Sequence, residues 1–163
     1  MYEIGIITVS DKGSRGERVD ESGPVIKEMV KSLGEVTSYI VVPDDLDLLK
    51  EAMISMSDKE KLDLVFTSGG TGFSSRDNTP EATLAVIRKQ APGLVEAMRA
   101  DSLKRTNRAM LSRAVAGIRN NTLIINLPGS VKAVRECLAV IMPALPHGLE
   151  ILTGRGGECG SAE

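Results

Sequence analysis

Aromatic side chains are scarce in this sequence: they account for 2% of its 163 residues, and tryptophan is absent. The core must therefore be aliphatic, and the hydrophobic fraction of 42% is enough for one compact domain. So few aromatic residues cannot form the stacking platform that binds single-stranded RNA. The formal net charge of −2 also argues against the basic face that general nucleic-acid binding requires.

Cysteine and histidine are nearly missing. Cys137 and Cys159 are too few for a disulfide framework, so we expect a buried thiol and a free thiol in the tail, in a reducing compartment. The single histidine, His147, follows Pro146 and has no nucleophile signal beside it, so we expect neither a histidine-centred zinc site nor a Ser-His-Asp triad. Acid–base or metal chemistry must then come from carboxylates.

Long apolar runs are also absent. None approaches the roughly 20 residues that span a bilayer. Met1 is followed directly by a strand pattern, without the features of a signal peptide. We therefore expect a cytoplasmic protein with no membrane partner and no nucleic-acid partner.

Strand and helix patterns alternate from the first residue, which predicts an α/β fold with a mostly parallel sheet. A short antiparallel hairpin is predicted around Asn120-Asn121. We expect one domain over residues 1–153 and a polar, flexible tail over 154–163. The expected strands are 4–9, 36–42, 62–66, 114–118 and 122–126, and the expected helices are 22–33, 46–56, 79–90, 94–104, 131–141 (capped by Ser130) and 143–152.

A glycine-rich loop, Thr67–Gly72, follows the third strand. Glycine permits positive φ and close approach of the backbone, so successive N–H groups can point at an anion. The loop matches neither a dinucleotide fingerprint nor a P-loop. A merely tight turn is the plainer alternative. The anion-binding hypothesis names Ser68, Gly69, Gly70, Thr71 and Gly72.

Arg76 and Asp77 lie between this loop and a predicted helix start, where Thr79 suits the N-cap and Pro80 the first turn. Arg76 can bind a phosphate bidentately. Asp77 among phosphates would need a cation between them, and Mg²⁺ is the usual one. An exposed surface pair is the alternative, and the spacing alone does not decide between the two.

Asp44 ends the second strand and also has two interpretations. It can cap the following helix, or it can be a second carboxylate that faces Asp77 and helps to hold Mg²⁺ against a triphosphate.

Two further loops are rich in hydrogen-bond donors. The segment Asn126–Ser130 ends the last strand and opens a helix, whose N-terminus suits an anion, although a simple capped start explains it equally well. The loop that begins with Ser10 and Asp11 carries Lys12 and Arg15, which either offset nearby acidic groups or are simply solvated.

These loops together resemble the molybdenum-cofactor biosynthesis proteins of the MogA/MoaB type and the corresponding domains of plant Cnx and animal gephyrin. The resemblance runs from Ile4 to about Leu152. It is carried above all by Thr67–Gly72, by Arg76-Asp-Asn-Thr-Pro-Glu-Ala-Thr83 and by Asn126-Leu-Pro-Gly-Ser130. It also includes Met110-Leu-Ser-Arg113, the helix start at Asp20–Pro24, and Pro43-Asp44-Asp45.

The resemblance implies a three-layer α/β/α fold, a homotrimer, and transfer of AMP from ATP to the terminal phosphate of molybdopterin with Mg²⁺ required. It matches Asp44 and Asp77 to the family's catalytic carboxylates, which we also expect to hold the metal. The chain carries no second domain after Gly154, so we expect adenylylation without metal insertion, and hand-over to a molybdate-insertion protein. The expected substrate-binding residues are Ser10, Asp11, Ser68, Gly69, Gly70, Thr71, Gly72, Arg76, Ser112, Asn126, Pro128, Gly129 and Ser130.

Two other functions compete with this one. The same domain occurs in a competence-damage-related family that acts on dinucleotide pyrophosphates, usually with a deamidase domain that is missing here. A non-catalytic protein that binds the pterin or acts as a scaffold is the second alternative, and the presence of both Asp44 and Asp77 favours catalysis over it.

Overall fold

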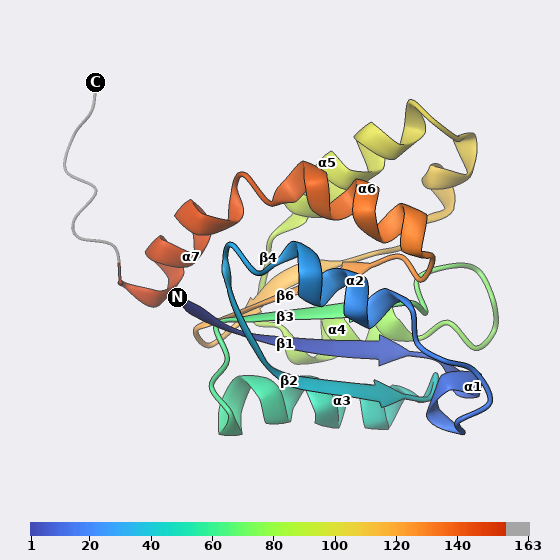
Figure 1. The fold of residues 1–163 in the computed structure, drawn as a ribbon, viewed down its shortest axis with the longest axis horizontal. Coiled ribbons are helices and arrows are strands. Elements are labelled where there is room, and N and C mark those ends of the chain that lie inside the picture. Colours follow the sequence, from blue (N-terminus) through green and yellow to red (C-terminus); the bar gives the residue numbers. More distant parts are fainter. Residues whose placement is uncertain (156–163) are drawn as a thin grey trace.

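The structure is a computed structural model that describes residues 1–155. Its centre is a six-stranded sheet in the order β2-β1-β3-β6-β5-β4 (Figure 1). The strands are β1 Tyr2–Val9, β2 Gly34–Val42, β3 Leu64–Ser68, β4 Lys89–Gln90, β5 Ala116–Arg119 and β6 Thr122–Leu127. The α-helices are α1 Asp11–Ser14, α2 Ser22–Met29, α3 Leu46–Ile54, α4 Thr79–Val86, α5 Pro92–Leu103, α6 Val131–Ile141 and α7 Leu145–Thr153, with a π-helical turn η1 at Ser55–Lys59 and a 3-10 turn η2 at Asn107–Leu111.

Helices cover both faces of the sheet, so the predicted three-layer α/β/α fold is confirmed. Helices α2, α5, α6 and α7 lie on one face, and α3 and α4 lie on the other (Figure 1). Strand β1 alternates between the two cores: Ile4 and Ile6 pack into the first, and Ile7 and Val9 into the second. Aliphatic residues fill both cores because a parallel strand buried on both faces needs apolar side chains throughout.

No single helix within residues 1–155 is long and apolar enough to cross a membrane. Helices α6 and α7 reach that length only together, and they meet at a bend of 66°.

The predicted hairpin is confirmed. Strands β5 and β6 pair antiparallel, and Arg119 lies opposite Thr122 across the turn. Asn120 takes a φ of 52°, a left-handed conformation that asparagine tolerates better than most residues.

The prediction of one helix over 79–90 is wrong. Helix α4 ends at Val86, Ile87 is extended, and Lys89 and Gln90 form β4 at the edge of the sheet. Strand β4 pairs with β5, and the N–H of Arg88 donates to the carbonyl of Ile118 at 2.8 Å. A helical sequence pattern cannot reveal this pairing, because the partner strand lies far along the chain and decides the outcome.

Several other predicted boundaries shift. The helix predicted over 22–33 ends at Met29, and the strand predicted over 62–66 is β3 at Leu64–Ser68. The helix predicted over 46–56 becomes a π-helical turn after Ile54. Of the predicted tail, Gly154 ends α7 in the left-handed conformation, while 156–163, with Cys159, lie outside the described residues.

The sheet brings the candidate loops to one edge. Strands β1, β2, β3 and β6 run parallel, so the loops that follow them leave from the same side. Ligands of open α/β sheets bind at this carboxyl edge.

Candidate active site

The glycine loop after β3 requires its glycines. Gly69 and Gly70 have φ values of 100° and 69°, which side chains of L-residues rarely adopt. A Cβ at Gly69 would lie 2.6 Å from the Val9 carbonyl oxygen, and one at Gly70 would lie 2.3 Å from Thr79 Oγ1. The loop therefore packs against the ends of β1 and the start of α4 too closely for any larger residue.

This loop also offers unpaired donors. The N–H of Gly69 donates to the Leu127 carbonyl, but within residues 1–155 the N–H groups of Gly70, Thr71 and Gly72 have no hydrogen-bond acceptor. Three successive free N–H groups in a loop with left-handed residues form a site suited to an anion. This supports the prediction that the loop binds phosphate rather than merely turning the chain.

Asp44 does not cap the helix that follows it. Asp45 does, because its Oδ1 accepts from the N–H of Leu48 at 2.9 Å. The Asp44 carboxyl group is thus free of the capping role. Burial raises its pKa, and the negative charges of Asp11 and Asp77 raise it further. Asp11 and Asp77 therefore both lie close enough to Asp44 at this edge of the sheet to repel its charge.

Asp77 is held by the loop that it terminates. Its Oδ2 accepts from the N–H of Ser74 at 3.0 Å. A Cβ at Gly72 would lie 2.9 Å from the same oxygen, so the carboxylate packs directly against this glycine. Thr79, predicted as the N-cap of the next helix, is instead the first residue of α4, and Asn78 occupies the cap position.

Arg76 forms a bidentate ion pair with Asp11. Its Nε and Nη2 donate to the two Asp11 carboxylate oxygens at 3.0 and 2.9 Å. The hydrogen bond from Arg76, and then the one from the N–H of Asp44, hold the pKa of Asp11 below its usual range. The pair joins the loop after β1 to the loop after β3, so a phosphate that binds Arg76 must compete with Asp11.

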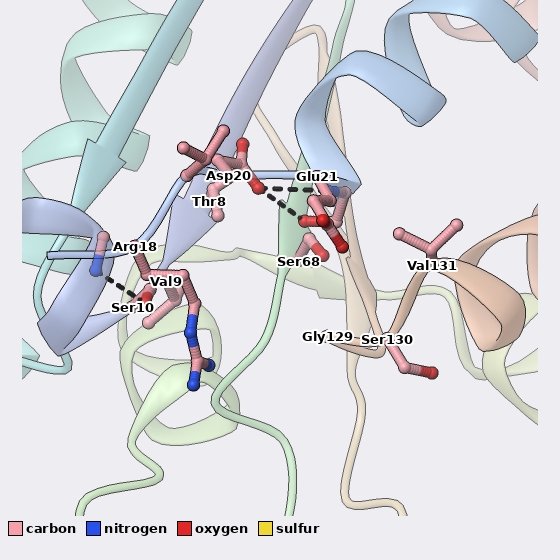
Figure 2. Close-up of a pocket in the computed structure, with 13 residues that line it drawn as sticks. Thr8, Val9, Ser10, Arg18, Asp20, Glu21, Ser68, Gly129, Ser130 and Val131 are labelled. Carbon is pink, nitrogen blue, oxygen red and sulfur yellow. Dashed lines mark hydrogen bonds between the residues drawn. The ribbon is translucent and has the colours of Figure 1, made fainter. Parts of the chain in front are cut away.

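A cavity of about 680 Å³ opens where β1, β3 and β6 end (Figure 2). Four predicted residues line it: Ser10, Ser68, Gly129 and Ser130. Helix α6 begins here, and Ser130 caps it as predicted by accepting from the N–H of Ala133 at 3.3 Å. The N-terminus of this helix adds partial positive charge to the cavity wall.

A second cavity, about 290 Å³, lies beside the first cavity's loops. Five predicted residues line it: Thr71, Gly72, Ser112, Asn126 and Pro128. Helix α5 and the turn η2 supply most of the remaining lining, which includes apolar residues such as Val95, Met98 and Leu111 and also Arg99 and Arg108. The glycine loop contributes Ser68 to the first cavity and Thr71 to the second, so it runs between the two.

Two predicted substrate contacts make internal hydrogen bonds. The side-chain amide of Asn126 is fully buried and donates to the hydroxyl oxygens of Thr67 and Thr83, both at 2.9 Å. Ser68 Oγ donates to the Pro128 carbonyl at 2.8 Å. Asn126 therefore ties β6 to β3 and α4, and Ser68 ties the glycine loop to the loop after β6.

Sequence reasoning missed Arg18 and Asp20, which also line the large cavity (Figure 2). Within residues 1–155 no acceptor pairs with the exposed Arg18 guanidinium, which makes it a candidate phosphate contact. Asp20 accepts from Thr8 Oγ1 at 2.8 Å and from the hydroxyl of Tyr39. Tyr39 lies on β2, so no local pattern reveals this contact, whereas Arg18 shares the donor-rich loop that begins at Ser10.

The residues fit a divalent cation only in part. No group of three histidine, cysteine, aspartate or glutamate side chains in the described chain is close enough to hold a metal by itself. Mg²⁺ usually binds through one or two carboxylates together with substrate phosphates and water. The hydroxyl of Thr79 is fully buried without a partner beside Gly70, close to Asp44 Oδ1. The unpartnered hydroxyl and the nearby carboxylates are oxygen ligands of the kind that such a cation prefers.

Comparison with known proteins decides the family. The protein-family model described as "probable molybdopterin binding domain" matches residues 5–147 of this chain. The chain belongs to this family. A molybdopterin adenylyltransferase from Helicobacter pylori is 46% identical over 154 residues, which cover 93% of this chain and 88% of the relative.

Solved structures of the family agree with the fold. A molybdopterin biosynthesis enzyme MoaB from Thermus thermophilus has a TM-score of 0.89 and 49% identity, and the match covers 94% of this chain and 98% of that one. A MogA structure has a TM-score of 0.87 and 38% identity, over 92% and 99% of the two chains. The predicted family and fold are both confirmed.

Proposed function

We propose that the chain is a molybdopterin adenylyltransferase that acts in molybdenum cofactor biosynthesis. The observation that carries this is the meeting of Asp44, Asp77 and the free N–H groups of the glycine loop at one sheet edge, in a chain 46% identical to a relative of that name. An oxygen of the terminal phosphate of molybdopterin attacks the α-phosphorus of ATP. The new P–O bond forms as the bond to the bridging oxygen breaks, and pyrophosphate leaves with that electron pair.

The two cavities provide room for two substrates on either side of the reacting phosphates. The glycine loop runs between them, so its N–H groups can bind the phosphate oxygens on which negative charge accumulates. The attacking phosphate is already anionic at neutral pH, so a strong base is not required. Positioning and charge neutralisation are then the main needs of the reaction.

Asp44 and Asp77 would hold Mg²⁺ together with the phosphates of ATP, and the cation would neutralise negative charge there. Burial raises the pKa of Asp44 first and the charges of Asp11 and Asp77 raise it further; a bound cation would relieve that charge repulsion. Arg76, beside Asp11, and Arg18, in the lining of the first cavity, are guanidinium groups that would bind the remaining phosphate charge.

Three further proposals concern the setting of the reaction. We propose that the chain works in the cytoplasm as a homotrimer and passes its product to a molybdate-insertion protein. These follow the resemblance to the family.

The test is an assay with ATP, Mg²⁺ and molybdopterin that measures adenylylated molybdopterin and pyrophosphate in equal amounts. We expect Asp77→Asn to lower kcat about 100-fold or more while molybdopterin binding is kept, since misplaced charge at the reacting phosphates costs on this order. Turnover by Asp77→Asn at the native rate contradicts the mechanism. Hydrolysis of ADP-ribose in place of adenylyl transfer supports the pyrophosphatase alternative, and pterin binding without either reaction supports the non-catalytic one.

A further inference from the structure

Arg113 contacts both ends of the loop that carries Asp77. Its Nε donates to the Gly72 carbonyl at 2.8 Å, and its Nη2 donates to the Asp77 carbonyl at 3.0 Å. Its Nη1 pairs with Glu81 on α4. The planar guanidinium thus joins three separate points of the chain, which a single lysine ammonium cannot do in the same geometry.

The backbone of Arg113 adds a fourth contact. Its N–H donates to the Thr71 carbonyl at 2.9 Å, one residue before the Gly72 carbonyl that its side chain binds. The side chain and the backbone of Arg113 together therefore hold the end of the glycine loop and the backbone of Asp77 in place. Only about a third of the side chain is exposed, which strengthens these hydrogen bonds relative to exposed ones.

The segment that carries Arg113 is itself anchored. Arg99 on α5 donates from Nε and Nη2 to the Ser112 carbonyl, at 3.2 and 3.1 Å. Helix α5 packs into the core through Val95 and Met98. The contacts thus run from a core helix through Ser112 and Arg113 to the active-site loop.

We propose that Arg113 is a positioning residue for Asp77: it fixes the loop so that the Asp77 carboxylate and the free N–H groups of Gly70–Gly72 face the same phosphates. Arg113 itself has no contact with substrate in this role. Its two carbonyl contacts flank Phe73–Arg76. Within residues 1–155 the hydrogen bonds of that stretch are short-range ones among residues 74–78, apart from the exposed Arg76–Asp11 pair. The inference depends on the proposed function for its kinetic consequences, but its structural consequence does not.

The test compares Arg113→Lys with a matched variant, Arg119→Lys. Arg119 also donates to a carbonyl and to a carboxylate: to Val86 at 2.8 Å, and to Asp58 at 3.0 and 2.6 Å. It lies on β5 opposite Thr122, the first residue of β6, whereas the site lies where β6 ends. We expect Arg113→Lys to lower kcat about 10- to 100-fold with KM for ATP changed less than about threefold, because displacement by about 1 Å costs on this order. We expect Arg119→Lys to keep kcat within about twofold.

A second measurement separates positioning from loss of folding. Hydrogen exchange should speed up about tenfold or more at the hydrogen-bonded amides of Ser74, Arg76 and Asp77 in Arg113→Lys, and stay unchanged there in Arg119→Lys. Added guanidinium should partly restore kcat to Arg113→Ala and not to Asp77→Asn.

The outcomes are distinct. Native kcat in Arg113→Lys, or equal loss in both lysine variants, overturns the inference. If the native chain shows no adenylyl transfer, the proposed function fails, and unchanged exchange at the amides of Ser74, Arg76 and Asp77 in Arg113→Lys then overturns the inference independently.

Discussion

Asp44 occupies a position that is unfavourable for its own charge. It is partly buried, two other carboxylates lie near it, and its neighbour Asp45 performs the capping that Asp44 would otherwise do. Asp11 escapes the same repulsion because Arg76 pairs with it. The negative charge of Asp44 therefore lowers the stability of the folded state, and a neutral side chain would avoid this cost. Such unfavourable charges are typical of functional sites.

Asp44→Asn should therefore stabilise the protein and inactivate it. The folded pKa of Asp44 is raised, so the folded state binds this proton more tightly than the unfolded state does. The contribution of Asp44 to stability then falls as pH rises from the unfolded pKa, about 3.9, through the folded pKa. We expect the Tm at pH 7 to rise by about 1 to 2 °C, after allowing for solvent screening of a partly exposed group.

The rise in Tm caused by Asp44→Asn should vanish below the unfolded pKa of Asp44, because the folded and the unfolded native chain both carry the proton there. Thermal unfolding of both proteins across the pH range measures it, and adenylyl transfer measures the loss of activity. Asp45→Asn is the matched control, because asparagine caps a helix as well as aspartate does. A lower Tm for Asp44→Asn at pH 7 would contradict the argument.

At the scale of elements, local signals predicted well and distant ones did not. The Asn120-Asn121 turn and the Ser130 cap depend on neighbours within a few residues, and both were correct. Strand β4 depends on β5, which lies more than 25 residues later, so a helical pattern predicted it wrongly. The place of Asp20 depends on Tyr39 in strand β2, a distant contact that no local sequence pattern reveals.

Gly70→Ala tests whether the glycine loop needs its close approach to α4. Gly16 has a similar φ, 73° against 69°, but a Cβ there would have nothing within 4 Å. Gly16→Ala should therefore cost about 1 to 2 kcal/mol from backbone strain alone. Gly70→Ala should cost at least about 1 kcal/mol more, because its Cβ would meet the Thr79 hydroxyl.

Unfolding in urea measures both free energies. Gly70→Ala should also lower kcat, since the N–H groups of residues 70–72 shift with the loop. Equal destabilisation by the two substitutions would mean that the loop moves away from α4 without cost.

On the scale of the whole molecule, the parallel strands collect loops from four separate parts of the sequence at one edge. The loops after β1, β2, β3 and β6 are linked there by contacts between distant residues, including Arg76 with Asp11 and Ser68 with Pro128. A ligand that binds across them stabilises the fold as a unit, because it must be released before the loops separate.

Ligand binding should therefore raise the Tm of the full chain. A non-hydrolysable ATP analogue with Mg²⁺, present at about 100 times its Kd, should add about 2.7 kcal/mol. In a domain of this size that corresponds to a rise of about 5 to 10 °C. The analogue without Mg²⁺ should give a much smaller rise, because Asp44 and Asp77 then repel its phosphates.

Thermal unfolding measured with each addition separately provides the comparison. Asp44→Asn provides the control, because removing one of the two carboxylates should lessen the difference in Tm that Mg²⁺ makes. An equal rise with and without Mg²⁺ in the native chain would mean that the nucleotide phosphates bind away from these carboxylates.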